Sequence, residues 1–384
     1  MKYNLADICE YAKGKVDVAI LDEETYISTE NMMPNKGGIT SASSLPAIAQ
    51  AQAFLAGDVL VSNIRPYFKK IWFAEFDGGC SNDVLVFRAK DGVSKRFLYY
   101  VLADDTFFDY SMATSKGTKM PRGDKAAIMK YEVPDFTYEE QEKIAGILEV
   151  LDRKIQLNTE INENLEEQLS ALFIHDFADD IATASTDTCP MLGDLITVID
   201  NRGKTPPLTT EIFDYPIIDV GALKGSGRIV DFNNCTKYVE QATYESWFRS
   251  GHPKPWDILI STVGSLAEMK IYLGSKGCMA QNVVALRATS ISPLYLYQYL
   301  RFIRADLVAY NIGSVQPSIK VTHIVKHPIF VPEISKLQEF EETARAITNR
   351  LYANYNECES LKELRDTLLP RLMSGEIDVS DLAL

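Results

Sequence analysis

Cationic side chains lie in loops beside the clearest predicted strands of both halves of this 384-residue chain. Lysine and arginine in such loops can bind the phosphates of a nucleic acid, because they supply positive charge and hydrogen-bond donors. For each of them, a solvated surface charge is the alternative. The candidates are Arg65, Lys69, Lys70, Lys119 and Arg122 in the first half, and Arg202, Lys204, Lys224, Arg228, Lys270 and Lys320 in the second.

Three amide side chains of the second half, Gln281, Asn282 and Gln316, could read the edges of bases. An Asn or Gln can donate and accept at once, which matches adenine in the major groove. An amide in a turn more often bonds to nearby backbone, so both interpretations stay open.

The sequence offers little for catalysis. It contains no phosphate-binding or dinucleotide-binding glycine motif, and no Asn/Asp-Pro-Pro-Tyr/Phe segment of the kind that amino-methyltransferases carry. Asp257, Glu268 and Lys270 loosely resemble a metal-dependent nuclease, but short acidic-x-Lys patterns are common and the first half has no equivalent. His323 and His327 are four apart, yet we expect strand or loop there and see no third ligand. We therefore predict no catalytic residue and no metal site.

Two long segments must position these loops. Their apolar residues recur in steps of four and three, the spacing of a coiled-coil seam, which predicts helices over residues 138–173 and 335–372. Asn158, Asn162 and Asn354 interrupt the seams; a buried Asn there lowers stability but fixes register. The seam residues are Ile144, Leu148, Leu151, Ile155, Leu165, Leu169 and Leu172, then Phe340, Ala344, Ile347, Leu351, Cys358, Leu361 and Leu368.

The stretches before the two helices repeat one another in order, which indicates an internal duplication. Asp58-Val-Leu-Val-Ser62 returns as Asp257-Ile-Leu-Ile-Ser261, and Gly117-Thr-x-x-Pro121 returns as Gly313-Ser-x-x-Pro317. Residues 31–56 have no counterpart in the second half. A repeated framework with different loops predicts two binding surfaces of different specificity.

Each globular stretch is predicted to be mixed α/β. In the first, strands at 58–62, 71–76 and 83–87 precede a helix at 96–102, with a turn at Gly78-Gly79. Six scattered cysteines, no signal peptide and no long apolar run indicate a cytoplasmic protein with reduced thiols.

The net charge of −14 is concentrated in the helices. Residues 1–137 carry −2, residues 138–180 carry −9, residues 181–334 carry +1 and residues 335–384 carry −4. Both globular stretches can therefore present a basic face, whereas the helices, most strongly the first, repel phosphate and suit a protein partner.

Four stretches of the sequence together form a specific pattern: Arg202-Gly-Lys-Thr-Pro-Pro207 before a strand at 217–220, Asp257-Ile-Leu-Ile-Ser261 with Gln281-Asn-Val283, Glu139-Glu-Gln-Glu-Lys-Ile144, and Arg365-Asp-Thr-Leu-Leu-Pro-Arg-Leu-Met-Ser-Gly-Glu-Ile377. In their order and spacing, these stretches resemble the specificity subunits of type I restriction-modification systems over essentially the whole chain. The second helix keeps only Gln338 of the family's Glu-Gln start.

The resemblance implies two α/β target-recognition domains, residues 1–137 and 181–334, each reading half of a split site in double-stranded DNA. Antiparallel coiled-coil helices, residues 138–180 and 335–384 with the C-terminal tail, would relate the halves by a pseudo-twofold axis, set their spacing and dock two methyltransferase subunits. A translocating nuclease subunit is a further implied partner. S-adenosylmethionine would bind to the methyltransferase, so this chain would be non-catalytic and hold no cofactor.

A coiled-coil adaptor that does not bind DNA is the alternative, because an apolar seam often serves packing alone. An adaptor does not need two divergent sets of loops on a duplicated framework. The loop divergence therefore favours the DNA-reading interpretation.

Overall fold

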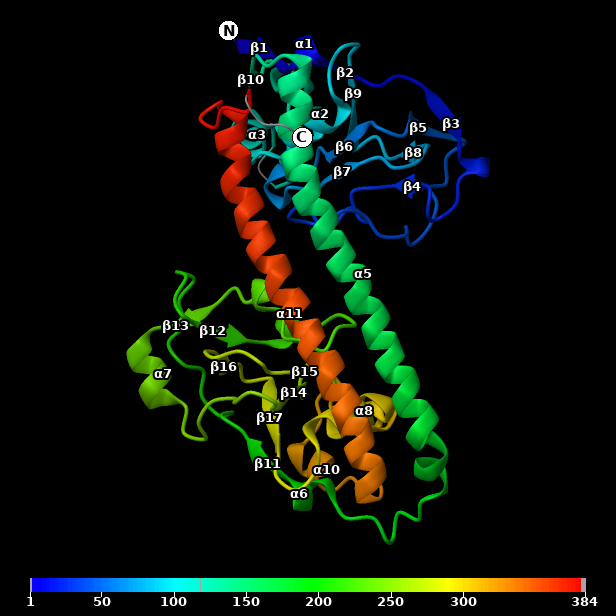
Figure 1. Ribbon diagram of the computed structural model, residues 1–384, viewed down its shortest axis with the longest axis vertical. Helices are drawn as coiled ribbons and strands as arrows, with labels where there is room; N and C mark the ends of the chain where they lie inside the picture. Colours follow the sequence, from blue (N-terminus) through cyan, green and yellow to red (C-terminus); the bar gives the residue numbers. More distant parts are fainter. Residues whose placement is uncertain (1, 118, 381–384) are drawn as a thin grey trace. The chain divides into compact units, whose positions relative to one another are not determined.

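The computed structural model describes residues 2–117 and 119–380. The chain forms two compact units: the first comprises Met1–Gln156 with Glu359–Leu384, and the second comprises Leu157–Cys358. Each unit contains an α/β globular part and a stretch of both long helices, α5 (Tyr138–Thr183) and α11 (Ile334–Met373) (Figure 1). The predicted architecture of two α/β parts and two long packed helices is confirmed.

The first unit is built on an antiparallel sheet of order β2-β9-β6-β7. A second sheet has the order β3-β5-β8-β4, with β4 parallel to β8, and β1 pairs with β10. The strands are β1 (Lys2–Asn4), β2 (Cys9–Tyr11), β3 (Lys15–Asp17), β4 (Tyr26–Ile27), β5 (Gln50–Phe54), β6 (Val59–Ser62), β7 (Ile71–Phe73), β8 (Gly78–Cys80), β9 (Val84–Ala89) and β10 (Glu132–Pro134).

The turn predicted at Gly78-Gly79 is wrong, because both glycines belong to β8. A Cβ atom on Gly79 would lie 2.5 Å from Leu21 Cδ1 and 2.8 Å from Val16 Cγ1. The glycines therefore serve close packing within the second sheet. Sequence patterns also missed β5, which lies in the segment without a counterpart in the second half.

Helices cover one face of the first unit's main sheet, where Val59, Val61 and Phe87 pack with Leu98 and Leu148. Ser94 and Asp104 accept hydrogen bonds from backbone N–H groups at the starts of α2 and α3, which fixes where these helices begin. The helices are α1 (Leu5–Ile8), α2 (Lys95–Ala103), α3 (Asp105–Ala113) and α4 (Lys125–Ile128), with short 3-10 turns η1 (Val18–Ile20) and η2 (Pro66–Phe68).

The second unit repeats the main sheet, in the order β11-β17-β14-β15, and adds a smaller sheet of order β13-β12-β16. The strands are β11 (Ile196–Ile199), β12 (Tyr215–Ile218), β13 (Tyr238–Val239), β14 (Ile258–Ser261), β15 (Met269–Ile271), β16 (Cys278–Met279) and β17 (Val283–Ala288). The helices are α6 (Leu192–Leu195), α7 (Gln241–Trp247), α8 (Pro293–Phe302), α9 (Arg304–Ala309) and α10 (Val321–Val325), with 3-10 turns η3 (Val220–Leu223) and η4 (Phe232–Asn234).

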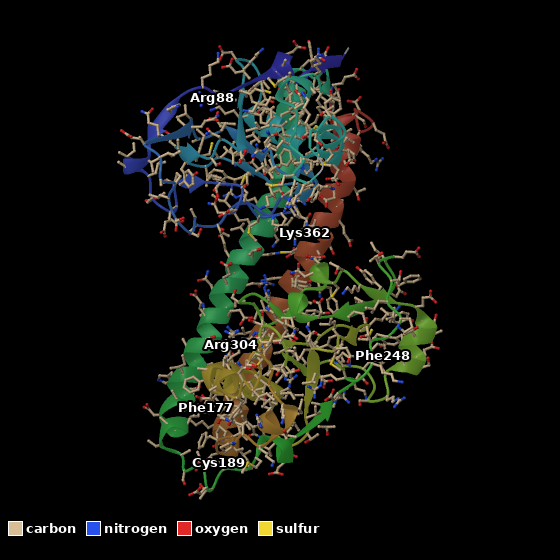
Figure 2. The ribbon with its side chains drawn as sticks, turned by 180° about the vertical axis from the view of Figure 1, so that it is seen from behind. Arg88, Phe177, Cys189, Phe248, Arg304 and Lys362 are labelled. Carbon is tan, nitrogen blue, oxygen red and sulfur yellow. The ribbon has the colours of Figure 1, made fainter. Side chains whose placement is uncertain are left out.

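The same ion pair between a buried aspartate and a partly exposed arginine stands beside both main sheets. Asp58 bonds at 2.6 Å to Arg88, which Figure 2 labels, and Asp257 bonds to Arg287 at 2.7 Å. Each aspartate is 2% exposed and also accepts a backbone N–H from three residues earlier in the chain. The duplicated framework therefore extends to side chains.

Helices α5 and α11 are antiparallel within each unit. In the first unit Asp152 pairs with Arg365, and in the second Asp180 pairs with Lys336. Phe177 (Figure 2) packs edge-on against Phe340 and the α8 residue Tyr295. The predicted seam positions are buried or half-buried, and α5 extends ten residues beyond the predicted end at residue 173.

Asparagines occupy the middle of this seam in the second unit. Asn158 is 0% exposed and donates to Glu357 Oε2 at 2.7 Å. Asn354 is 1% exposed and donates to Asn162 Oδ1 at 2.8 Å.

Within residues 2–117 and 119–380, no helix is both long and apolar enough to cross a membrane.

Candidate nucleic-acid interface

In the first unit, backbone hydrogen bonds join three loop segments next to the main sheet. After β6, the Asn63 N–H donates to the Asp83 carbonyl at 2.8 Å, and the Arg65 N–H donates to the Pro121 carbonyl at 2.9 Å. Lys116 and Arg122 exchange two backbone hydrogen bonds, at 2.9 and 3.0 Å. The strand end, the segment before β9 and the segment around Pro121 thus form one surface.

The second unit builds the same junction from different residues. The Thr262 N–H donates to the Asn282 carbonyl at 2.8 Å, and the Gly264 N–H donates to the Pro317 carbonyl at 3.0 Å. The Ile312 N–H donates to the Ser318 carbonyl at 2.9 Å. The junction is therefore part of the duplicated framework, whereas its side chains differ between the units.

Several cations of the first-unit surface are held by carboxylates. Arg122 bonds to Asp83 at 3.0 Å and its side chain stays 55% exposed. Lys69 and Lys36 both bond to Asp105, at 2.7 and 2.9 Å. Although burial opposes the effect, these two lysines lower the pKa of Asp105. Arg122 and Lys69 are thus oriented and still solvent-accessible, whereas the Lys36 side chain is only 11% exposed.

Arg65 and Lys70 are less accessible. Lys70 donates to the Thr29 carbonyl at 2.6 Å, and burial lowers its pKa. Arg65 is half-buried, with a positive φ of 50° and a buried Nε. Lys119 is exposed.

In the second unit, the loop after β11 presents cations beside two shallow grooves. One groove of about 520 Å³ is lined by Arg202, Val263, Ile312 and Lys320 among others. A second of about 510 Å³ extends from Asp200–Lys204 to Ser246–Ser250 and includes Trp247 and Arg249. Because Asp200 and Arg202 line both, the two grooves are neighbours.

Hydrogen bonds hold this loop in place. Asn201 donates to the Gly251 carbonyl at 2.8 Å and accepts from the Ser250 N–H at 2.9 Å. Gln281 accepts from the Gly203 N–H at 2.8 Å and donates to the Lys204 carbonyl. Gln281 therefore has a structural role as a loop support, the alternative that its sequence context left open.

Two of the predicted phosphate-binding residues are instead inside the protein. Arg228 is 0% exposed, bonding to Glu166 of α5 at 2.8 Å and to Thr348 of α11 at 3.1 Å. Lys270 is 3% exposed and donates to the carbonyls of Gly225 and Gly227, and burial lowers its pKa to about 8. The prediction is wrong for both, because neither side chain can reach a ligand at the surface.

The remaining candidates fall into two groups. Lys204, Lys224, Gln316 and Lys320 are exposed. Asn282 is half-buried, with a buried Oδ1. Sequence reasoning missed Lys36, Lys116, Trp247 and Arg249. For Lys116, the signal available was its place in the same loop as Lys119 and Arg122.

Residues that loosely resembled a nuclease do not converge. Asp257 pairs with Arg287, Glu268 pairs with Arg304 (Figure 2) at 2.7 Å, and Lys270 holds backbone carbonyls. His323 lies in helix α10, not in the predicted strand or loop, and His327 Nδ1 bonds to Tyr310. Among the described residues no three His, Cys, Asp or Glu side chains could hold a metal ion.

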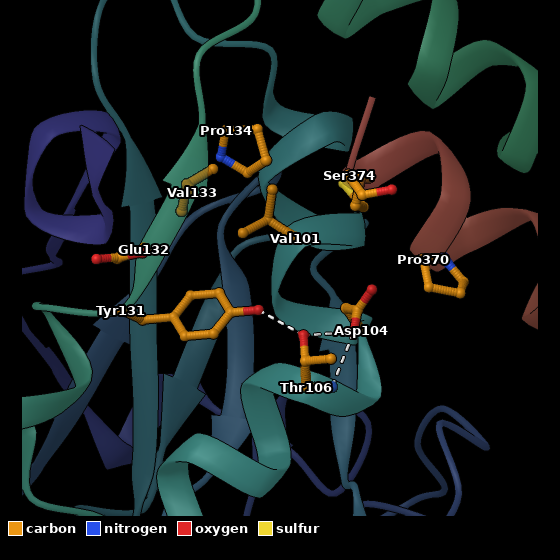
Figure 3. Close-up of a pocket in the computed structure, with 10 residues that line it drawn as sticks. Val101, Asp104, Thr106, Tyr131, Glu132, Val133, Pro134, Pro370 and Ser374 are labelled. Atoms are coloured by element: carbon orange, nitrogen blue, oxygen red, sulfur yellow. Dashed lines mark hydrogen bonds between the residues drawn. The ribbon is translucent and has the colours of Figure 1, made fainter. Parts of the chain in front are cut away.

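A cavity of about 430 Å³ lies in the first unit. It lies among α2, β10 and the end of α11 and is lined mainly by apolar atoms. Val101, Pro134 and Pro370 are among the residues that supply them (Figure 3). Thr106 bonds to both Asp104 and Tyr131, each at 2.6 Å. These polar groups therefore satisfy one another.

Comparison with known proteins gives a consistent result. The family described as type I restriction modification DNA specificity domain matches residues 1–167. The chain is 25% identical to the type I restriction enzyme MjaIX specificity subunit of Methanocaldococcus jannaschii, covering 76% of this chain and 71% of that one. It is 24% identical to the HindI specificity subunit of Haemophilus influenzae, covering 98% and 99%.

A solved structure supports the fold. The crystal structure of a type I restriction-modification system S subunit from M. genitalium aligns with a TM-score of 0.55 at 17% identity. The alignment covers 97% of this chain and 96% of that one. The likeness therefore extends over both units.

Proposed function

Because the chain belongs to the family of type I restriction-modification specificity subunits, we propose that its two globular parts each read one half of a bipartite DNA site. As a specificity subunit, the chain is a non-catalytic component of such an enzyme. We assign the reading to residues 1–137 and 181–334.

One observation carries the proposal: the same loop junction is built twice with different exposed side chains. Asn63–Asp83 and Thr262–Asn282 are equivalent backbone hydrogen bonds, both 2.8 Å long. A constant framework holds the protein in register on DNA, and its changed side chains read sequence. We propose as phosphate contacts Lys69, Lys119, Arg122, Arg202, Lys204, Lys224 and Lys320, with Lys116 and Arg249 added.

The long helices would set the spacing between half-sites and dock two methyltransferase subunits. Their excess of carboxylates disfavours contact with phosphate and leaves them to a protein partner. The methyltransferase would bind S-adenosylmethionine and flip the target base, which this chain is not proposed to do. A nuclease subunit would complete a restricting complex in the cytoplasm.

Genome-wide mapping of modified adenines, with the gene for this chain present and deleted, tests the proposal. We expect a two-part motif with an unspecified gap that disappears on deletion. If no motif depends on the chain while its methyltransferase partner is expressed, the proposal fails. A coiled-coil adaptor would then be the remaining interpretation.

A further inference from the structure

In the second unit, the repeated Gly-Ser/Thr-x-x-Pro segment is part of a closed loop of residues 311–318, which we call the 311–318 loop. Asn311 Oδ1 accepts hydrogen bonds from the N–H groups of both Gly313 and Ser318, each at 2.9 Å. The Pro317 carbonyl accepts from Gly264, just after β14. The loop is thus pinned at its base and to the main sheet.

The two framework residues of the segment have clear physical roles. A Cβ atom at Gly313 would collide with the Gln316 carbonyl, so only glycine lets the two sides of the loop approach this closely. Pro317 restricts the backbone where its carbonyl meets the sheet. Of the three residues between them, Ser314 belongs to the repeated pattern, and Val315 and Gln316 are left free to vary.

Those two residues form an exposed tip. Val315 is 98% exposed, the largest value among the exposed large hydrophobic side chains of the described residues. Gln316 is also exposed, and Ile312 is 52% exposed where it lines the groove with Arg202 and Lys320. An apolar side chain so exposed on a pinned loop contributes nothing to packing within the chain and is free to contact a ligand.

The equivalent positions of the first unit carry different chemistry. Lys116 stands where the second unit has Ile312, Lys119 where it has Val315, and Arg122 where it has Ser318. Lys116 and Arg122 exchange backbone hydrogen bonds as Ile312 and Ser318 do in part. Three cations are therefore replaced by neutral side chains on the same framework.

We propose that the 311–318 loop reads bases of the second unit's half-site, with Val315 and Gln316 as specificity-determining residues. This rests on the proposed function. Val315 would contact an apolar base edge such as a thymine methyl group, and Gln316 would pair with a base edge by donating and accepting hydrogen bonds. Arg202 and Lys320, which line the adjoining groove, would hold the flanking phosphates.

The test uses the chain in its complex with the methyltransferase subunits. Adenine methylation is mapped genome-wide for the wild type, for the double variant Val315→Ala/Gln316→Ala and for the control Val331→Ala, an exposed valine before α11. We expect the double variant to lose discrimination at one or more positions of one half-site, by at least about fivefold. The other half-site, the gap and the control should match the wild type.

Three outcomes are distinguishable. An unchanged motif in the double variant overturns the inference while leaving the proposed function intact. Equal loss of methylation at every site also overturns it, because the loop would then supply affinity or stability. If the wild type itself has no two-part motif, the proposed function fails first.

A second variant separates the tip from its support. Gly313→Ala keeps both tip side chains but forces the loop to open, because the new methyl group collides with the Gln316 carbonyl. We expect it to relax the same half-site as the double variant. Relaxation of the opposite half-site would contradict the assignment.

Discussion

The two units attach similar sheets to the same two helices by different chemistry. In the second unit, fully buried Arg228 joins Glu166 of α5 to Thr348 of α11. In the first unit, Tyr100 and Arg365 both bond to Asp152 of α5 at 2.8 Å, and that carboxylate stays 29% exposed. A duplicated framework can therefore keep its geometry while the ion pair that attaches it to the helices changes from partly exposed to buried.

The main sheets show the same difference. In the first unit, Trp72 of β7 pairs with Leu60 of β6. In the second unit, the equivalent strand position is Lys270 of β15, which pairs with Leu259 of β14. Lys270 donates to the carbonyl of Gly225 in the neighbouring loop, and Arg228 bonds to Glu166 of α5. The second unit thus has more charge inside it and should be more sensitive to losing one partner.

Removing Glu166 should have the largest effect. Glu166→Ala leaves Arg228 buried without its carboxylate and Arg301 without its 3.4 Å partner, so we expect the second unit to lose about 3–5 kcal/mol of stability. The matched Asp152→Ala should cost the first unit only about 1 kcal/mol, because its ion pair is partly exposed. Urea unfolding with hydrogen exchange assigns each loss to a unit.

A double replacement sharpens this comparison. Glu166→Leu with Arg228→Met removes the buried charges together, and we expect it to recover most of the stability lost in Glu166→Ala. Equal losses for Glu166→Ala and Asp152→Ala would show that the two attachments do not differ in energy.

The buried aspartates of the main sheets should instead behave alike. Asp58→Ala and Asp257→Ala each remove a buried carboxylate that bonds to an arginine and to a backbone N–H. We expect each to lower the free energy of unfolding by about 2–3 kcal/mol. A difference above about 1 kcal/mol between the two variants would break the equivalence of the frameworks.

The helix seam also differs between the units, because the asparagines that interrupt it all lie in the second unit. Replacing Asn162 and Asn354 together with Leu substitutes a polar pair by apolar packing, and we expect a gain of about 1 kcal/mol with a loosened register. The measurements are the melting temperature and the gap length of the mapped DNA motif. A gap as strict as that of the wild type would count against the spacing role.

Lowering the pH from 7.5 to 5.5 should give the smallest effect, and in this range it should fall on the second unit, which contains all four histidines. Burial lowers the pKa of His252 and of His327 in the folded unit. The unfolded chain then binds more protons, so stability is lost as pH falls below about 6.5. The variant His252→Gln/His327→Gln should lose less than the wild type between pH 7.5 and 5.5 in urea unfolding.

Much of the fold was predictable because its signals are local. The repeated Asp-Val/Ile-Leu-Val/Ile-Ser strands and the four-three seam report periodicity, which depends on neighbours along the chain. The duplication also located the loop junction, since Gly313 and Pro317 recur with Gly117 and Pro121. Sequence alone thus determined the architecture, the family resemblance and which loops carry the candidate surface.

Only the tertiary structure decided which cations face outward. Lys224 and Arg228 are four residues apart in one loop, yet the first is exposed and the second has no exposed surface. The difference comes from Glu166 and Thr348, which lie 62 and 120 residues away in the sequence. A buried charge requires partners brought from distant segments, and no local pattern records where those partners will be.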